Sequence, residues 1–229
     1  MGRLRAVLEA LNLTDDTVIV FYSDNGFLTG DHGLIDKRNA SEASVKVPMI
    51  VYAPKDAKGG STNKTRIRNL DLAPTFLDIA GIQKPKQFEG KSAWPLITGE
   101  QDRESWGEPD FLYQYYWEWS FPMTPTTLAI TRDDIKYIQY HGIWDLEELY
   151  DLALDPEEKV NRINDPEYYF VRQALRTALY AQAANPGGGR TPFHTPRDWP
   201  RASTYAIKMG LKPRHFRNPG KLNLIAQIG

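Results

Sequence analysis

A short apolar run followed at once by oxygen-rich polar side chains is the feature that most constrains this chain. Residues 18–22 are Val-Ile-Val-Phe-Tyr, and Ser23-Asp24-Asn25-Gly26 follows directly. β-Branched and aromatic residues favour a strand, and a near-continuous apolar run is typical of a strand covered on both faces. In open α/β sheets, ligands bind just beyond the carboxyl ends of the strands. The segment therefore predicts an α/β sheet with a functional loop from residue 23 onward.

The loop over residues 23–46 carries side chains suited to a metal site that processes an anion. Asp24 and Asn25 offer adjacent hard oxygen atoms, the ligands that calcium and magnesium prefer. Lys37 supplies a point charge for an anionic substrate. The same residues suit an ordinary turn, because Asn and Gly tolerate positive φ, and the spacing does not match an EF-hand. Both interpretations stay open on the loop alone.

Further elements follow in the first hundred residues. Residues 4–11 have the apolar spacing of a short helix, and residues 47–52 form a second apolar strand. A helix is predicted over residues 71–79, with Asp71 as its cap, Pro74 in its first turn and Gly81 at its C-terminal end. We assign residues 1–100 to one core region.

The composition changes after residue 110. Aromatic residues crowd positions 111–119, and three later segments (128–130, 137–140 and 148–152) predict antiparallel strands joined by tight turns. A helix with one apolar stripe is expected over residues 165–183. We assign residues 101–185 to an α+β subdomain, and the Pro- and Arg-rich residues 186–229 to an extended or wrapping tail.

Composition excludes several classes of function. The chain has no cysteine, so disulfides, thiolate metal sites and a cysteine nucleophile are excluded. Its formal net charge of −1 gives no global field that favours nucleic acid. No run approaches the roughly 20 apolar residues that cross a bilayer, and no signal peptide is visible.

Several ordered segments of this chain closely resemble the second half of the sulfatase signature. Sulfatases belong to the alkaline-phosphatase-like superfamily, and the resemblance extends over much of the chain. It implies an α/β fold, namely the closing part of an alkaline-phosphatase-like mixed sheet followed by a small antiparallel sheet with a packed helix. The segments that carry it are Ser23-Asp24-Asn25-Gly26, Gly30-Asp31-His32-Gly33, Lys37-Arg38, Glu42, Val47-Pro48-Met49-Ile50-Val51, residues 69–81, Glu89-Gly90-Lys91-Ser92, Glu148-Leu149-Tyr150-Asp151-Leu152, Asp155-Pro156-Glu157-Glu158 and Asn161.

The resemblance implies a role for each matching site residue. Asp24 and Asn25 match calcium ligands of the family, with calcium favoured over magnesium. Lys37 matches a catalytic lysine that contacts the sulfate ester. His32 matches a position that is either a substrate contact or a loop anchor, and both readings stay open.

The chain departs from the family in its nucleophile. Sulfatases attack with a formylglycine made from a Cys or Ser in a Cys/Ser-x-Pro/Ala-x-Arg motif, and no such motif is present here. The resemblance places formylglycine and the remaining metal ligands in an N-terminal half of the enzyme. We therefore expect this chain to be the C-terminal part of a sulfatase, to need that half as its partner, and to be inactive alone.

The aromatic residues indicate the substrate class, because their faces stack on sugar rings. Tyr115, Tyr116, Trp117, Glu118 and His141 are candidate contacts to a sulfated carbohydrate, and His141 is the strongest among them because it lies in a turn at the end of a predicted strand. Filling of the interior is the alternative role for the aromatic residues. By family, a periplasmic or secreted location in a bacterium is expected.

Three other functions remain open: a phosphonate or phosphodiester hydrolase of the same superfamily, a non-catalytic carbohydrate-binding module, and a gene product without function. None predicts contact with nucleic acid or a membrane span.

Overall fold

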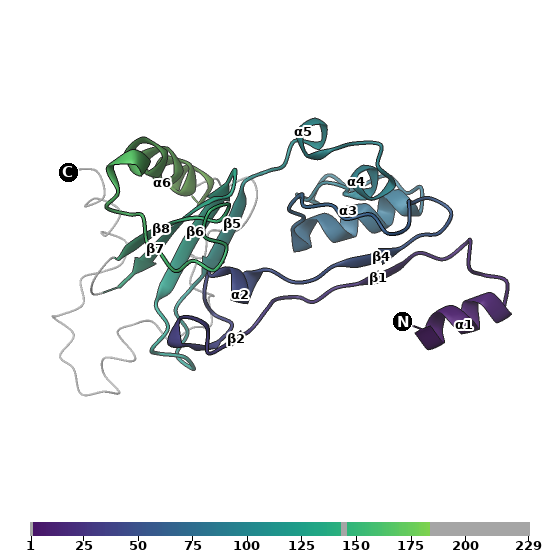
Figure 1. Cartoon of the computed structure of the whole chain (residues 1–229), viewed down its shortest axis with the longest axis horizontal. Helices are drawn as coiled ribbons and strands as arrows, with labels where there is room; N and C mark the ends of the chain where they lie inside the picture. The colour runs from purple at the N-terminus through teal and green to yellow at the C-terminus, as the bar shows by residue number, and fades with distance from the viewer. Residues whose placement is uncertain (1, 143–145, 184–229) are drawn as a thin grey trace. The chain divides into compact units, whose positions relative to one another are not determined.

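The computed structural model describes residues 2–142 and 146–183, all of which belong to one compact unit (Figure 1). The predicted tail therefore lies outside the described residues, and the predicted boundary near residue 100 stays a prediction. Within the described residues no helix is long and apolar enough to cross a membrane. The first elements are α1 (Gly2–Ala10), β1 (Ile19–Phe21), β2 (Leu28–Thr29), η1 (Asp31–Gly33), β3 (Ile35–Asp36), α2 (Glu42–Val45), β4 (Ile50–Tyr52), α3 (Asn69–Ile79), α4 (Trp94–Thr98) and α5 (Arg103–Trp106).

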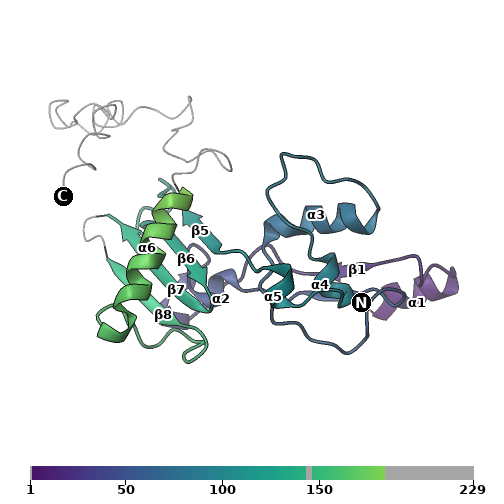
Figure 2. The same ribbon diagram turned by 90° about the horizontal axis from the view of Figure 1, so that it is seen from above.

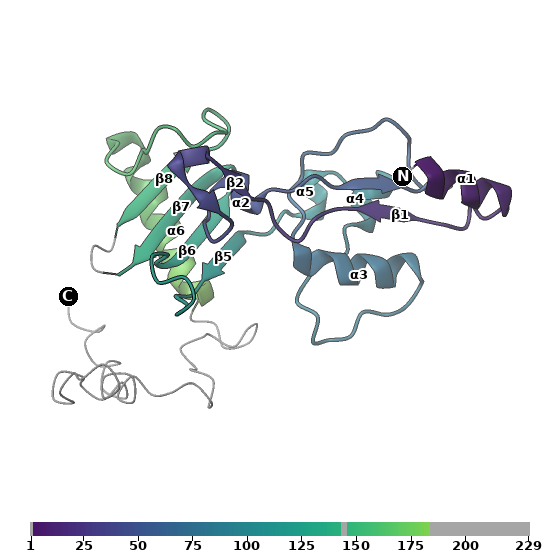
Figure 3. The same cartoon turned by 90° about the horizontal axis from the view of Figure 1, so that it is seen from below.

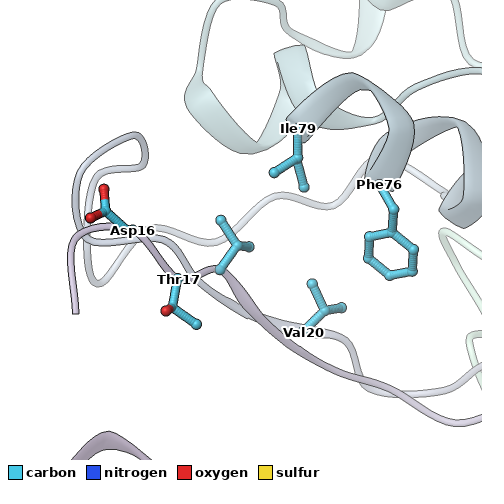
Figure 4. Close-up of a pocket in the computed structure, with 6 residues that line it drawn as sticks. Asp16, Thr17, Val20, Phe76 and Ile79 are labelled. Atoms are coloured by element: carbon cyan, nitrogen blue, oxygen red, sulfur yellow. The ribbon is translucent and has the colours of Figure 1, made fainter. Parts of the chain in front are cut away.

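The two predicted apolar strands pair with each other. β1 and β4 run antiparallel, with Val20 opposite Val51. In Figure 4, Phe76 and Ile79 of α3 face Val20 across a hollow of about 450 Å³. Phe21 is 51% exposed and Ile50 is 54% exposed, so the cover on both faces expected for this pair is not provided by the described residues.

Helix α3 begins two residues earlier than predicted. Arg68 is its N-cap, and Asp71 is the third helical residue, whose carboxylate accepts the Arg68 backbone N–H at 2.9 Å. Pro74 consequently lies inside the helix, and the predicted first-turn position is wrong. A proline there cannot donate to the Leu70 carbonyl one turn earlier. The chain at Gly90 passes over that carbonyl, where a Cβ atom would lie 1.8 Å from the Leu70 oxygen.

The second half forms the predicted antiparallel sheet, in the order β5-β6-β7-β8. Its strands are β5 (Phe111–Tyr115), β6 (Thr126–Arg132), β7 (Ile135–His141) and β8 (Glu147–Asp151), and η2 (Pro166–Tyr168) and α6 (Tyr169–Ala183) follow. Asp133 and Asp134 connect β6 to β7 with φ values of 47° and 64°. Two consecutive positive φ values are typical of the two-residue hairpin turn that matches strand twist. The expected α/β class with a helix on an antiparallel sheet is thus confirmed.

One face of this sheet carries α6, as Figures 1 and 2 show. Leu175 and Leu179 of the helix pack on Leu128, Ile130 and Tyr137 of β6 and β7. Both leucines belong to the predicted apolar stripe, and both are at most 1% exposed. Burial of these side chains removes apolar surface from water, which stabilises the helix on the sheet.

The opposite face of the sheet supports part of the functional loop. Ala40 packs on Ala129, Ile138 and Tyr150, which alternate along their strands with the residues that face α6. Figure 3 shows β2 and α2 on this side of the sheet. Because strand side chains alternate between faces, β6 and β7 separate the helix from the loop.

Candidate functional site

The pair Asp24 and Asn25 lies directly after β1, as predicted. The Asp24 carboxylate accepts the Asn25 backbone N–H at 3.0 Å and the Ser23 hydroxyl at 3.3 Å. The Asn25 amide nitrogen donates to the Gly26 carbonyl at 2.6 Å, so the amide oxygen is the atom directed away from Gly26. On the backbone side, Asn69 at the start of α3 donates its amide to the Asp24 carbonyl at 2.7 Å. The loop is thus anchored on α3.

Gly26 and Ser44 bring this pair toward Lys37. The Gly26 N–H donates to the Ser44 carbonyl at 2.7 Å, and the Ser44 hydroxyl donates to the Lys37 carbonyl. A Cβ atom on Gly26 would lie 2.3 Å from the Ala43 carbonyl oxygen, so only glycine allows this approach. Ser44 therefore joins the backbone beside the metal-ligand candidates to the backbone of the candidate sulfate-binding lysine.

Lys37 itself is exposed, at the end of the short hairpin formed by β2 and β3. Its backbone N–H donates to Asp36 Oδ1 at 2.7 Å, and the same oxygen accepts Arg38 Nη1 at 2.7 Å. Asp36 thereby holds two consecutive residues of the loop. Nearby, burial raises the pKa of Tyr113 to about 12, so its hydroxyl stays protonated above the pH near 10 at which a free tyrosine titrates.

The buried ammonium group of Lys136 joins residues 40–42 of the loop to the sheet. Lys136 of β7 donates to the Ala40 carbonyl at 2.9 Å and to Glu42 Oε1 at 2.6 Å. Glu158 contributes a second carboxylate at 2.7 Å from Lys136 Nζ, and it also accepts the Glu42 backbone N–H at 2.6 Å. A carboxylate at the first turn of α2 satisfies a backbone donor that has no partner inside the helix. These contacts fix residues 40–42, immediately after Lys37.

His32 contacts the same network. Its Nε2 atom lies 4.0 Å from Glu158 Oε2, and its side chain is 31% exposed. His32 and Glu158 both have a φ of 54°, in the left-handed region that few non-glycine residues adopt. The two roles left open for His32, loop anchor and substrate contact, both stay predictions.

His141 ends β7, opposite Thr126 of β6. Its Nε2 atom is buried and has no hydrogen-bond partner among the residues that the structure describes. Buried polar atoms normally have a partner. The contact of His141 with substrate stays a prediction.

The connection between β5 and β6, residues 116–125, is here called the aromatic loop. Trp117 donates its backbone N–H to Thr126 Oγ1 at 2.9 Å, which places this loop beside the strand position opposite His141. The Arg38 guanidinium lies 3.2 Å from the centroid of the Phe121 ring, and Arg38 Nε lies 3.6 Å from Glu118 Oε1. The structure therefore brings the aromatic loop against the residue that follows Lys37.

Asp24 and Asn25 are suited to supply part of a calcium coordination shell. Calcium takes about 6–8 oxygen ligands, and Asp24 and Asn25 provide two of the right chemical type. Within residues 2–142 and 146–183, no three His, Cys, Asp or Glu side chains are grouped so that they could hold a metal ion. The other ligands must come from elsewhere.

Sequence reasoning missed the residues that position the site. Asn69, Ser44, Lys136 and Glu158 all act on the loop through long-range or backbone contacts, so no local spacing marks them. Two of these residues, Asn69 and Glu158, lie in the segments 69–81 and 155–158 that carried the family resemblance, which was the available signal.

The chain resembles proteins of known activity. Residues 30–185 match the family model described as N-sulphoglucosamine sulphohydrolase, C-terminal. The N-acetylglucosamine-6-O-sulfatase of Bacteroides thetaiotaomicron is 36% identical over 179 residues, which cover 78% of this chain and 32% of that protein. The chain spans about a third of the length of the curated relatives that it matches.

Solved structures share the fold. A protein solved in complex with its substrate D-glucosamine-2-N,6-O-disulfate superposes with a TM-score of 0.74 at 32% identity, covering 82% of this chain and 39% of that chain. The phosphonate monoester hydrolase of Agrobacterium radiobacter superposes with a TM-score of 0.64 at 25% identity, covering 79% of this chain and 38% of that chain. The predicted alkaline-phosphatase-like fold class is confirmed.

Proposed function

This chain belongs to the sulfatases, in the family described as N-sulphoglucosamine sulphohydrolase, C-terminal, and from that premise we propose that it supplies part of the active site of a sulfuric ester hydrolase. The substrate is a sulfated carbohydrate. The observation that supports the proposal is a connection through Ser44. Its carbonyl accepts the N–H of Gly26, next to Asn25, and its hydroxyl donates to the carbonyl of Lys37. Asp24 and Asn25 would hold a calcium ion, and that ion and the Lys37 ammonium would both act on one sulfate group.

Each residue has a distinct task. Asp24 and Asn25 would hold calcium, which when bound neutralises the sulfate oxygens. Lys37 stabilises the negative charge that develops as the ester bond to sulfur breaks, and it acts as a fixed cation. His32 holds the loop, and His141 contacts the sugar. Formylglycine, the nucleophile of the family, belongs to a part of the enzyme outside this sequence, because the chain has no cysteine and no serine in the required motif.

The fit to a sulfated amino sugar is supported by the relatives, which include an N-acetylglucosamine-6-O-sulfatase and a protein bound to a sulfated glucosamine. A periplasmic or secreted location in a bacterium accompanies this substrate class in our proposal. Fractionation of cells that express the native gene, followed by detection of this chain, tests the location.

The activity is tested with three proteins: the 229-residue chain, the chain preceded by its upstream coding sequence, and the chain fused to the N-terminal two thirds of the Bacteroides relative. Each is assayed for sulfate release from 4-nitrophenyl sulfate and from glucosamine 6-sulfate with calcium present. We expect activity in an extended form and none in the chain alone. Release by the chain alone would contradict the assignment of the nucleophile, and no release by any form would remove the proposed activity.

A phosphonate monoester hydrolase is the second candidate, because one such enzyme shares the fold at 25% identity. A sulfatase cleaves sulfate esters fastest, whereas a phosphonate monoester hydrolase cleaves phosphonate esters fastest. Parallel assays of the active form on 4-nitrophenyl sulfate and on 4-nitrophenyl phenylphosphonate decide between them. A higher kcat/KM on the phosphonate would replace the sulfatase proposal with the second candidate.

A further inference from the structure

The aromatic loop presents large apolar rings to solvent beside the candidate sulfate site. Trp117 is 40% exposed, Trp119 is 53% exposed and Phe121 is 37% exposed. The rings of Trp117 and Trp119 are edge-packed, with centroids 6.2 Å apart and an interplanar angle of 78°. Clustered apolar surface of this kind marks a binding site more often than isolated exposed residues do.

The loop is fastened so that its rings keep their positions. The Trp117 indole N–H donates to the Pro122 carbonyl at 3.2 Å, which uses the polar edge of that ring inside the loop. Two backbone turns close the segment, from Phe121 N–H to the Glu118 carbonyl and from Thr124 N–H to the Phe121 carbonyl, both at 3.1 Å. A site that is already ordered loses less conformational entropy when it binds a ligand.

Charges of both signs surround the rings. Arg38 lies against the Phe121 ring and is paired with Asp36 at 2.7 Å and with Glu118 at 3.6 Å. These two pairs hold the guanidinium between Asp36, which precedes Lys37, and Glu118 of the aromatic loop. An exposed ring face to stack on and a carboxylate to accept hydroxyl groups, here that of Glu118 at 47% exposure, are together what a pyranose ring needs.

We propose that the aromatic loop is a subsite for the pyranose ring that neighbours the sulfated sugar, so that the substrate is an oligosaccharide. Trp117 stacks on the apolar C–H face of that ring, Trp119 contacts its edge, and the Glu118 carboxylate accepts its hydroxyl groups. The inference deepens the proposed function and rests on it for the position of the sulfated sugar. Binding of the neighbouring ring by the loop does not require turnover.

The first test measures binding to the 229-residue chain by calorimetry. The probes are a heparin-derived tetrasaccharide that contains 2-N,6-O-disulfated glucosamine, and the monosaccharide glucosamine-2-N,6-O-disulfate. We expect Trp117→Ala to weaken tetrasaccharide binding about tenfold, in line with the loss of one stacking contact, and to leave monosaccharide binding unchanged. Trp117→Phe should restore most of the affinity, and Trp117→Leu should not.

Met123→Ala is the matched control, because Met123 lies in the same loop, is 92% exposed and has no ring. The second test measures KM in the active extended form. Trp117→Ala should raise KM for the tetrasaccharide about tenfold, with KM for 4-nitrophenyl sulfate unchanged.

Equal effects of Trp117→Ala on both probes, no effect on either, or no tetrasaccharide binding to the chain would overturn the subsite. Tetrasaccharide binding that depends on Trp117, without sulfate release by any extended form, would support the subsite and remove only the proposed activity. Sulfate release by an extended form, together with tetrasaccharide binding that does not depend on Trp117, would support the proposed activity and overturn the subsite.

Discussion

The Nζ atom of Lys136 lies 2.7 Å from Oε1 of Glu158, and both side chains are 1% exposed. Glu42 adds a second carboxylate at 2.6 Å from the same ammonium. A buried charge is tolerated only when opposite charges and hydrogen bonds compensate for its lost hydration. The pair therefore locks the sheet, the loop after Lys37 and the segment after β8 into one arrangement.

Lys136→Met should destabilise the chain by about 3–5 kcal/mol, because it leaves the Glu158 carboxylate buried without its cation. The double variant Lys136→Met/Glu158→Gln should recover part of that loss, since the glutamine carbonyl can still accept the Glu42 N–H. Urea unfolding followed by circular dichroism measures both free energies.

Lys159→Met is the control, because its partner Glu157 is 68% exposed and the Lys159 side chain is 72% exposed. Exposed pairs contribute about 0–1 kcal/mol. A Lys136→Met variant that is no less stable than this control would contradict the account of the network.

Gly26→Ala should destabilise the loop by about 1–3 kcal/mol, because the new methyl group overlaps the Ala43 carbonyl oxygen at 2.3 Å. Gly59→Ala is matched to it, since nothing lies within 4 Å of a Cβ atom there. Thermal unfolding of the two variants side by side gives the comparison. Equal melting temperatures would mean that residues 26 and 43 are not in close contact.

Lys37→Ala should lower kcat of the active extended form by about 10²-fold or more, because it removes a cation from the developing charge. Lys46→Ala, an exposed lysine of the same loop, should leave kcat unchanged. Steady-state kinetics on 4-nitrophenyl sulfate decide the matter, and an unaltered kcat would exclude Lys37 from the reaction.

Asp24→Ala should raise the calcium concentration needed for half-maximal activity, or abolish activity, because calcium loses a charged ligand. A calcium titration of the extended form after chelator treatment measures the shift. Asp15→Ala, an exposed carboxylate before β1, serves for comparison. If both variants titrate like the parent protein, Asp24 is not a calcium ligand.

Asp110→Asn should cost about 1–3 kcal/mol at pH 7. The Asp110 carboxylate accepts two hydrogen bonds from Arg132, at 2.8 and 2.7 Å, and one from Gln182 at 2.6 Å. The Arg132 guanidinium lowers the pKa of this carboxyl group, whereas the unfolded group titrates near pH 4. The stabilisation is therefore complete above about pH 4 and is lost as the pH falls through the lower folded-state pKa.

Urea unfolding at several pH values tests this sign. The difference between the parent protein and Asp110→Asn should be constant from pH 5 to 7 and should shrink below about pH 4. A difference that grows on acidification would show that the group is not stabilised as an anion.

The sequence predicted those parts of the fold that follow from local patterns. The stripe with Leu175 and Leu179 specified both α6 and the face that it buries, because helical periodicity is a property of neighbouring residues. Alternation and turn residues likewise located β6 and β7.

Features that depend on distant partners could not be predicted in this way. Lys136 in a strand has the pattern of a solvent-facing residue, and only its position against Ala40 and Glu42 makes it buried. The start of α3 was misplaced because arginine is an unusual N-cap residue, and because the Asp71 carboxylate acts from the third helical position, where it accepts the Arg68 N–H. For the candidate site, the residue types could be predicted but not the contacts that position them.

The two faces of β7 pack against different parts of the chain, so side chains on one face can change without altering the contacts of the other. Tyr137 faces α6, whereas its neighbours Lys136 and Ile138 face the loop that follows Lys37. Substitutions at every second position thus act on the face that supports residues 40–42 while the helix keeps its support. Insertion of a single residue in β7 would exchange the two sets and ruin both faces, whereas an insertion of two would preserve them. The strand thus allows one face to change in sequence independently of the other, and it allows changes of length only in even steps.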